Sequence, residues 1–180
     1  MTNKMLSART SSVAILEDGS CVVWLEYVGW ERKDFGQCNV PDTQGRKFVQ
    51  VSVGYDHVVA ILEDGSAIAW GDNGIGQCNI PDVGGRKFVQ VSAGERNTIA
   101  ILEDGSAISW GVTSIIPDTK GRKFVQISIG ESHTLAILDD GSAIAWGSNY
   151  SGELNIPDTR DRIFVQISAG SSYNIAILDD

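Results

Sequence analysis

Short apolar segments alternate with polar turns along the whole chain. Residues 88–92 (FVQVS) alternate in polarity and are rich in β-branched side chains, a pattern typical of a half-buried strand. Two further apolar segments follow, residues 98–102 (TIAIL) and 107–110 (AISW), and Asp104-Gly105 lies between them. Asp-Gly favours the tight turn of a β-hairpin, because both central residues of that turn have positive φ. The pattern predicts three short antiparallel strands and a fourth at the Cys-Asn-Ile-Pro segment, with no helix.

This unit recurs with a period near 40 residues. The first-strand Phe lies 13 residues before the second-strand Ile, and that Ile lies 9 residues before the third-strand Trp. Only the Trp-to-Pro distance varies, at 17, 11, 7 and 11 residues. A fixed period is typical of repeat proteins, whose units bury apolar faces against their neighbours. We expect one domain over residues 1–180, with units at 2–42, 48–82, 88–118 and 124–158 and a partial unit at 164–180 that a longer natural chain continues.

Two units carry an extended motif. Residues from Gly130 to Gly147 follow G-x-x-H-x-x-A-I-L-x-D-G-S-x-x-x-W-G, and residues from Gly54 to Gln77 follow the same pattern continued by x-N-x-x-G-Q. This motif resembles the regulator of chromosome condensation repeat. The resemblance implies an all-β fold made of β-propeller blades, which members of the family usually close into a ring of seven. With about four and a half units we expect an open or incomplete ring, whose terminal blades need cover from further residues, another chain or self-association.

Composition excludes several functions. The formal net charge of -9 argues against nucleic-acid binding, which needs clustered Lys and Arg. No apolar run is long enough to span a membrane. Cys38 and Cys78 occupy a place that Leu154 fills in a later unit, so they are expected to be buried free thiols rather than a disulfide or metal site. Free thiols indicate a reducing compartment, and we expect a cytoplasmic protein, or one delivered into a host cell if it is bacterial.

Strand order divides the loops between two faces. Alternate connections of an antiparallel meander lie on opposite faces, so the loops after Ser-x-Gly and after Trp-Gly should share one face, here named the loop face. The opposite face takes the Asp-Gly turns and the Gly-Arg-Lys connections. We interpret its opposite charges as a solvated rim of weak ion pairs rather than a charged docking site. The loop face carries all the length variation, and variable loops on a rigid β scaffold are where recognition usually resides.

The loop face also holds all four tyrosines of the chain. Tyr, Trp and Arg dominate the binding energy of protein interfaces, so we predict that this face binds a protein. The alternative is that its aromatic side chains pack over the bases of their loops. His57 and His133 occupy equivalent positions, for which the resemblance implies a structural role. The predicted partner-binding residues are Tyr27, Trp30, Arg32, Phe35, Tyr55, Asp56, His57, Asp72, Asn73, Glu95, Arg96, Glu131, His133, Asn149, Tyr150 and Tyr173.

No nucleophile elbow, phosphate-binding glycine loop or zinc-ligand spacing is present in the sequence. We therefore predict a non-enzymatic, protein-binding propeller scaffold without a cofactor or metal. The resemblance implies a wider range of functions. Some members of the family are exchange factors for a small Ran-type GTPase, and others bind membranes or ubiquitin-ligase partners or, in a bacterial case, inhibit a beta-lactamase. The alternative prediction is guanine-nucleotide exchange on, or activation of, a small Ran-type GTPase, although the residues used for it cannot be matched here.

Overall fold

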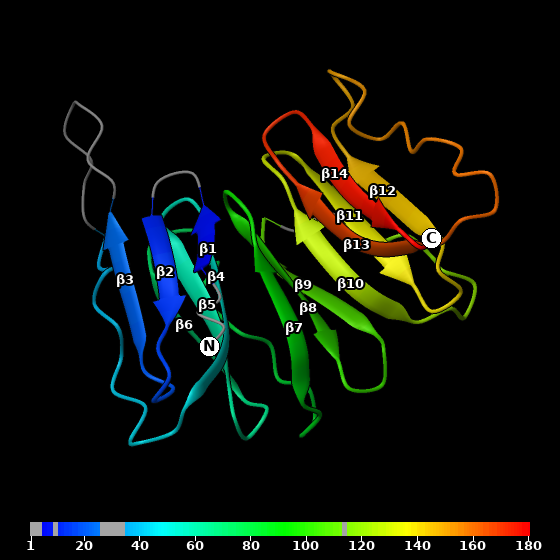
Figure 1. Cartoon of the computed structure of the whole chain (residues 1–180). Coiled ribbons are helices and arrows are strands. Elements are labelled where there is room, and N and C mark those ends of the chain that lie inside the picture. Colours follow the sequence, from blue (N-terminus) through cyan, green and yellow to red (C-terminus); the bar gives the residue numbers. More distant parts are fainter. Residues whose placement is uncertain (1–4, 9–10, 26–34, 113–114) are drawn as a thin grey trace.

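The computed structural model describes residues 5–8, 11–25, 35–112 and 115–180. These residues form five antiparallel sheets in chain order, here numbered blades 1 to 5 (Figure 1). Across these ranges no helix occurs, and so none that could cross a membrane. The strands are β1 (Met5–Ala8), β2 (Ser11–Ile15) and β3 (Cys21–Leu25); β4 (Phe48–Val53), β5 (His57–Leu62) and β6 (Ala67–Gly71); β7 (Phe88–Ala93), β8 (Asn97–Leu102) and β9 (Ala107–Gly111); β10 (Phe124–Ile129), β11 (His133–Leu138) and β12 (Ala143–Gly147); β13 (Phe164–Ala169) and β14 (Asn174–Leu178).

Each full blade has an inner, a middle and an outer strand, in that order along the chain. Inner strands β4, β7, β10 and β13 contact one another in succession. The register of β4 against β5 shifts between Phe48 and Gln50, where a β-bulge interrupts the alternation expected from the sequence. The bulge leaves Val49 54% exposed and brings Phe48 into the same core as Val51. The same shift recurs in β7, β10 and β13.

The apolar cores lie between neighbouring blades. In β5, Val58 and Leu62 pack against blade 1, whereas Val59 and Ile61 pack against blade 3. Every residue of β5 is consequently buried. A strand with both faces covered is expected to be continuously apolar, as this strand is after His57. The middle strands of blades 2, 3 and 4 thus depend on two other blades for their burial.

Pairs of aromatic rings explain the constant spacing of Phe and Trp. Phe48 and Trp70 meet edge to face, with ring centroids 6.3 Å apart and an interplanar angle of 61°. Equivalent pairs occur in blades 3 and 4. Such a pair contributes about 0.5–1.5 kcal/mol beyond its buried area. Because both rings belong to the core between blades, the distance between them along the chain is fixed by packing.

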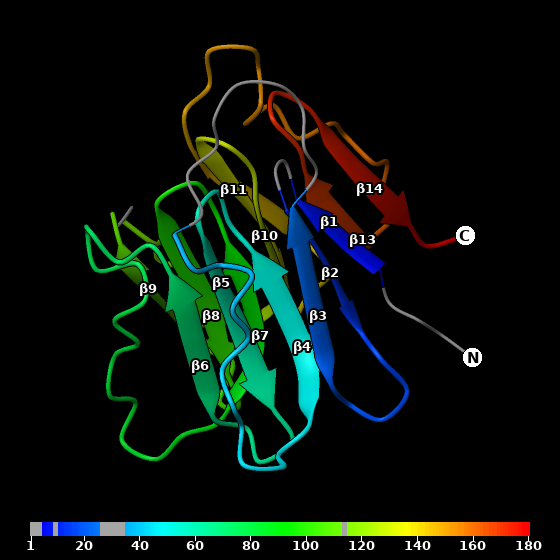
Figure 2. The same ribbon diagram turned by 90° about the vertical axis from the view of Figure 1, so that its left-hand side faces the viewer.

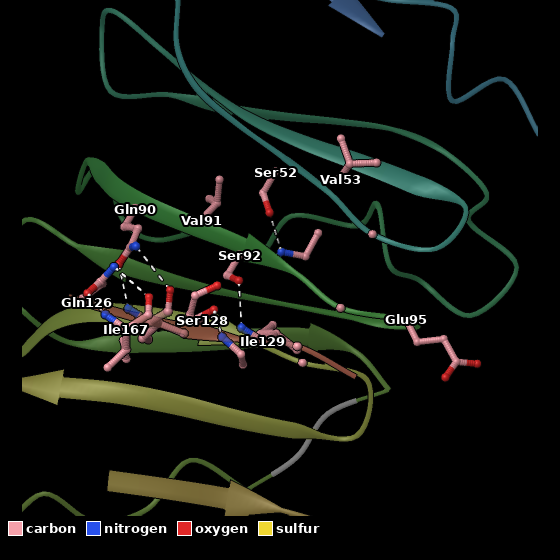
Figure 3. Close-up of a pocket in the computed structure, with 18 of the residues that line it drawn as sticks. Ser52, Val53, Gln90, Val91, Ser92, Glu95, Gln126, Ser128, Ile129 and Ile167 are labelled. Atoms are coloured by element: carbon pink, nitrogen blue, oxygen red, sulfur yellow. Dashed lines mark hydrogen bonds between the residues drawn. The ribbon is translucent and has the colours of Figure 1, made fainter. Parts of the chain in front are cut away.

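Glutamine and serine side chains connect the inner strands across blades (Figure 3). Gln90 of β7 accepts a hydrogen bond from the Ile127 N–H (2.8 Å) and donates one to the Ile127 carbonyl (3.2 Å). Two residues later, Ser92 Oγ accepts a hydrogen bond from the Ile129 N–H (3.0 Å). These bonds cover the strand edge that β11 leaves unpaired, since β11 pairs with the other edge of β10. Equivalent bonds come from Gln50 and Ser52 to blade 3 and from Gln126 and Ser128 to blade 5.

The blades form an open arc, with blade 1 at one end and blade 5 at the other (Figures 1 and 2). Exposure at the C-terminal end shows that the ring does not close. Ile175 of β14 is 61% exposed, whereas Leu135, its equivalent in β11, is 5% exposed. The sequence-based prediction of propeller blades in an open or incomplete ring is therefore confirmed.

Replacing Gln90 by Ala tests the glutamine connections. The change removes both hydrogen bonds to Ile127, and we expect the free energy of unfolding to fall by about 1–2 kcal/mol. Urea unfolding in dilute solution measures it. Gln166→Ala is the matched control, because Gln166 has the equivalent place in β13 but is exposed, and should change stability by less than about 0.5 kcal/mol. Equal losses in the two variants would contradict the role given to Gln90.

Candidate functional site

The two sets of loops on the loop face are joined within each blade. The Asp72 N–H donates to the Asp56 carbonyl (2.8 Å). The equivalent bonds in blades 3 and 4 run from the Val112 N–H to the Arg96 carbonyl (2.9 Å) and from the Ser148 N–H to the Ser132 carbonyl (2.8 Å). The Trp-Gly and Ser-x-Gly loops therefore lie together, as the strand order predicts.

The opposite face is built from ion pairs between turns. Arg86 Nη1 lies 3.0 Å from Asp104 Oδ2, and the same pair recurs as Arg46–Asp64 (3.3 Å) and Arg122–Asp140 (3.1 Å). The pKa of Asp104 is lowered to about 2, first by hydrogen bonds from the Ser106 hydroxyl and N–H and then by Arg86. These carboxylates belong to turns and are paired with arginines of the neighbouring connections, which supports the interpretation of this face as a rim.

Side-chain hydrogen bonds shape the Trp-Gly loop of blade 2. The Gln77 amide donates to Asp72 Oδ2 (2.6 Å), and its oxygen accepts from the Ile75 N–H (3.0 Å). Asn73 Oδ1 accepts from the Cys78 N–H (2.9 Å). Asp72 and Asn73, both predicted to contact a partner, thus also hold their own loop in shape.

The corresponding loop of blade 4 presents a tyrosine at the surface. Asn149 Oδ1 accepts a hydrogen bond from the Leu154 N–H (2.9 Å), and Glu153 Oε2 accepts one from the Ser151 N–H (2.8 Å). Backbone N–H groups of Glu153 and Ser151 hold the pKa of Glu153 below its usual value. Between these fixed points the Tyr150 side chain is 98% exposed.

Further predicted residues surround the centre of the loop face. Tyr173 is 64% exposed, and Tyr55 and Phe35 are each 40% exposed. The neighbouring charges are mostly acidic, and Arg96 Nε lies 3.6 Å from Glu95 Oε1. Glu131 accepts a hydrogen bond from the Ser171 hydroxyl of blade 5. Of the remaining predicted residues, Tyr27, Trp30 and Arg32 lie outside the described residues.

The two histidines lie between blades rather than at the surface. His57 is 0% exposed and His133 is 2% exposed. His57 Nε2 lies 2.9 Å from Thr98 Oγ1 of blade 3, and His133 Nε2 lies 2.7 Å from Asn174 Oδ1 of blade 5. A Cβ on Gly54 would come within 2.5 Å of the His57 ring, which explains the glycine of the motif. These contacts correct the inclusion of both histidines among the predicted partner-binding residues and favour the structural role that the resemblance implies.

A buried indole follows the short loop of blade 3. Trp110 Nε1 donates to the Gln77 carbonyl in the loop of the preceding blade (2.9 Å). Trp146 follows the short loop, in which Pro117 lies 7 positions after Trp110. Its side chain is 7% exposed, and its N–H finds no hydrogen-bond acceptor within the described residues.

A hollow of about 260 Å³ lies on the loop face between blades 3 and 4, and its lining includes Arg96, Val112, Glu131 and Gly147. Ile115, in the short loop, is 91% exposed. Sequence analysis did not single out Ile115. The signal for it is an apolar residue two positions before the Pro, where the other units have Asn39, Asn79 and Asn155.

A larger cavity of about 560 Å³ follows the inner strands (Figure 3). Its walls carry the Gln and Ser residues that connect the blades, and Tyr55, Glu95 and Tyr173 also line it. Sequence analysis did not predict this lining. Polar residues at alternate positions of an otherwise apolar strand are the signal, because they must face something other than an apolar core.

The described residues hold no group of three or more His, Cys, Asp or Glu side chains that could bind a metal ion. All three cysteines are free and partly buried. Burial raises the pKa of the Cys21 and Cys78 thiols to about 11. Both thiols are therefore protonated near neutral pH and are poor nucleophiles.

Comparison with protein families bears on this architecture. The model of the regulator of chromosome condensation (RCC1) repeat matches residues 48–77 and 124–153. Blades 2 and 4 carry RCC1 repeats. The resemblance stated from the sequence is thereby confirmed for these two segments. No curated protein matches the chain by sequence.

Solved structures extend the likeness to the other blades. Human WBSCR16 is 19% identical with a TM-score of 0.79, and the match covers 100% of this chain and 59% of that one. The ectodomain of the Physcomitrella patens receptor kinase CR4 is 18% identical, with a TM-score of 0.73 and coverage of 98% and 49%. Prp20p from Saccharomyces cerevisiae, described with its binding properties to Gsp1p and histones, is 16% identical, with a TM-score of 0.72 and coverage of 98% and 56%. The chain thus spans about half the length of these proteins and shares their fold.

Burial of the His57 in the first RCC1 repeat predicts a dependence of stability on pH. Burial lowers the pKa of His57 from 6.5 to about 4, an effect that Asp72 partly offsets. His57 therefore binds a proton more readily in the unfolded chain than in the folded one. The free energy of unfolding is highest above pH 6.5 and falls as the pH is lowered towards 4. The loss amounts to about 3 kcal/mol.

Urea unfolding at pH values between 7 and 4 measures this loss. His57→Asn is the informative variant, since Asn97 fills the same position in blade 3 and does not titrate. It should flatten the dependence in that window. Asp64, Asp104 and Asp140, with pKa values of about 2, protonate at lower pH. An unchanged profile in the variant would show that His57 is not responsible.

Proposed function

We propose that the chain is a non-enzymatic scaffold that binds a protein through its loop face. The observation that carries the proposal is Tyr150, which is 98% exposed on a loop held by the Asn149 and Glu153 hydrogen bonds. A large side chain presented to solvent from a fixed backbone loses little conformational entropy on binding. Tyr173 and Tyr55 add exposed aromatic area to the same face.

Charge narrows the class of partner. Asp56, Asp72, Glu95 and Glu131 make the described part of the loop face acidic, and Arg96 lies beside Glu95. The net charge of the chain is -9. Such a surface attracts a protein segment rich in Lys or Arg and accelerates its association. The partner is therefore a basic protein surface with room for tyrosine side chains.

The chemistry of the site supports a role without catalysis. Both histidines are buried between blades, and the thiols of Cys21 and Cys78 are protonated near neutral pH. No cofactor is required for the proposed binding. Cysteines that form no disulfide suit a reducing compartment, which supports a cytoplasmic location as part of the proposal.

Affinity capture with the immobilised chain tests the loop face. Tyr150→Ala combined with Tyr173→Ala should weaken capture of a basic partner at least tenfold, because truncating two exposed aromatic anchors removes about 2 kcal/mol or more. Raising the salt concentration should weaken it further. Lys120→Ala combined with Arg160→Ala, on the opposite face, is the control and should retain the partner. Undiminished capture by the tyrosine variant would contradict the choice of face.

Guanine-nucleotide exchange is the second candidate function. It is favoured by the likeness in fold to Prp20p, which is described with its binding properties to Gsp1p. A small Ran-type GTPase loaded with a fluorescent guanine nucleotide provides the assay. Under the scaffold proposal, micromolar chain leaves the release rate at its intrinsic value. Acceleration that the Tyr150→Ala and Tyr173→Ala changes abolish would instead establish exchange through the same face.

A further inference from the structure

The last blade exposes a face that is buried in every blade before it. Ile175 and Ile177 of β14 are 61% and 54% exposed. Their equivalents in β11, Leu135 and Ile137, are 5% and 3% exposed because blade 5 covers them. The pairings Ile175↔Ser168 and Leu135↔Ser128 establish this equivalence. The last blade thus ends on half of a blade–blade interface.

Polar groups on the same face are also without their usual partners. Gln126 and Ser128 accept hydrogen bonds from the Ile167 and Ala169 N–H groups of the next blade. Their equivalents Gln166 and Ser168 are exposed, and neither makes a side-chain hydrogen bond in the described chain. We name Gln166, Ser168, Ile175 and Ile177 the tail face.

The first blade exposes the complementary half. Leu16 is 41% exposed and Trp24 is 36% exposed, whereas the equivalent Leu62 and Trp70 are 0% and 8% exposed. The pairings Ser12↔Trp24 in blade 1 and Val58↔Trp70 in blade 2 establish this equivalence. Val22, opposite Ala14 on the same side, is 43% exposed. We name Leu16, Val22 and Trp24 the head face.

We propose that the chain associates head to tail, with the head face of one copy docked on the tail face of another as one blade docks on the next. Within the chain, this docking joins a middle strand to the inner strand of the following blade, as β5 to β7 and β11 to β13, and inner strands to each other. The tail supplies β13 and β14, and the head supplies β1 and β2. Every strand that makes the internal contact is therefore available at the junction.

Backbone register identifies the bonds that the tail glutamine and serine would make. Gln126 binds the backbone of Ile167, which pairs with Ala176. The residue of blade 1 equivalent to Ala176 is Ala14, and Ala14 pairs with Met5. Gln166 therefore matches the backbone of Met5 in the second copy. By the same register, Ser168 matches the Ser7 N–H. A second copy satisfies the polar groups as well as the apolar area of the tail face.

For the 180-residue chain, a second copy is the proposed occupant because the chain itself carries the complementary surface. Neither face contains an ionised residue, so their contact requires no charged partner. The overall charge of -9 opposes association of two copies, and added salt should strengthen it. Head and tail are different surfaces, so the interface is heterologous and builds a ring or an open filament. This association uses the ends of the arc and is independent of the proposed binding by the loop face.

Two variants with one blocked end each test the proposal. Ile177→Glu blocks the tail and Leu16→Glu blocks the head, and both positions are already exposed in the single chain. Ile61 and Leu102, the internal equivalents of this pair, share one core. Val125→Glu is the control, because Val125 is 59% exposed on β10 and belongs to neither face. Sedimentation equilibrium of the chain over a range of concentrations in moderate salt gives the masses.

The wild type and Val125→Glu should increase in mass with concentration, whereas each blocked variant should remain a monomer. An equimolar mixture of the two blocked variants should form a dimer and nothing larger, because one intact head and one intact tail remain. Circular dichroism verifies folding, and Ile175→Glu or Val22→Glu replaces a variant that does not fold. A wild type that stays monomeric, association of a blocked variant alone, or a mixture that stays monomeric would overturn the proposal.

Discussion

Contact between adjacent blades is the interaction on which the rest of the structure depends. Neighbouring blades bury each other's apolar side chains, since Val59 and Ile61 share a core with blade 3 and Leu62 shares one with blade 1. Hydrogen bonding follows the same rule, because the free edge of an inner strand is covered by Gln and Ser from the preceding blade. Stability in such an array is approximately a sum of nearest-neighbour terms, so it rises with each blade added.

Packing between blades keeps the Phe–Ile–Trp spacing constant and leaves the length of the Trp-Gly loops free to vary. Phe88 and Trp110 belong to the core between blades 2 and 3, and Ile101 belongs to the core between blades 3 and 4. Their spacing recurs wherever the unit is complete. The Trp-Gly loops need only return to the inner strand, so their length is free to change. This freedom is incomplete, because the Gln77 carbonyl accepts the bond from Trp110 in the next blade.

Local pattern was sufficient for three strands of a unit, the turns and the sharing of a face by two sets of loops, because each follows from alternation within one unit. The fourth strand predicted at the Cys-Asn-Ile-Pro segment was wrong, since residues 38–41, 78–81 and 154–157 contain no strand. It was insufficient for the bulge after Phe48, which depends on packing between blades. The hydrogen bonds of Gln50 and His57 each join residues 41 positions apart, and nothing in the local sequence identifies the partner. His57 therefore resembled a surface residue of its loop until the position of Thr98 was known.

Repetition has a further consequence for the ends of the arc. A side chain such as Gln126 recognises backbone groups and apolar area, both of which recur in every unit. The recognition is consequently not specific to a neighbour in the same chain, and any correctly spaced blade satisfies it. The head face and the tail face are therefore complementary because they are the two sides of the same repeated interface. What limits their association is the charge of -9 carried by each copy, so ionic strength, more than any loop residue, sets the balance between single chains and assemblies.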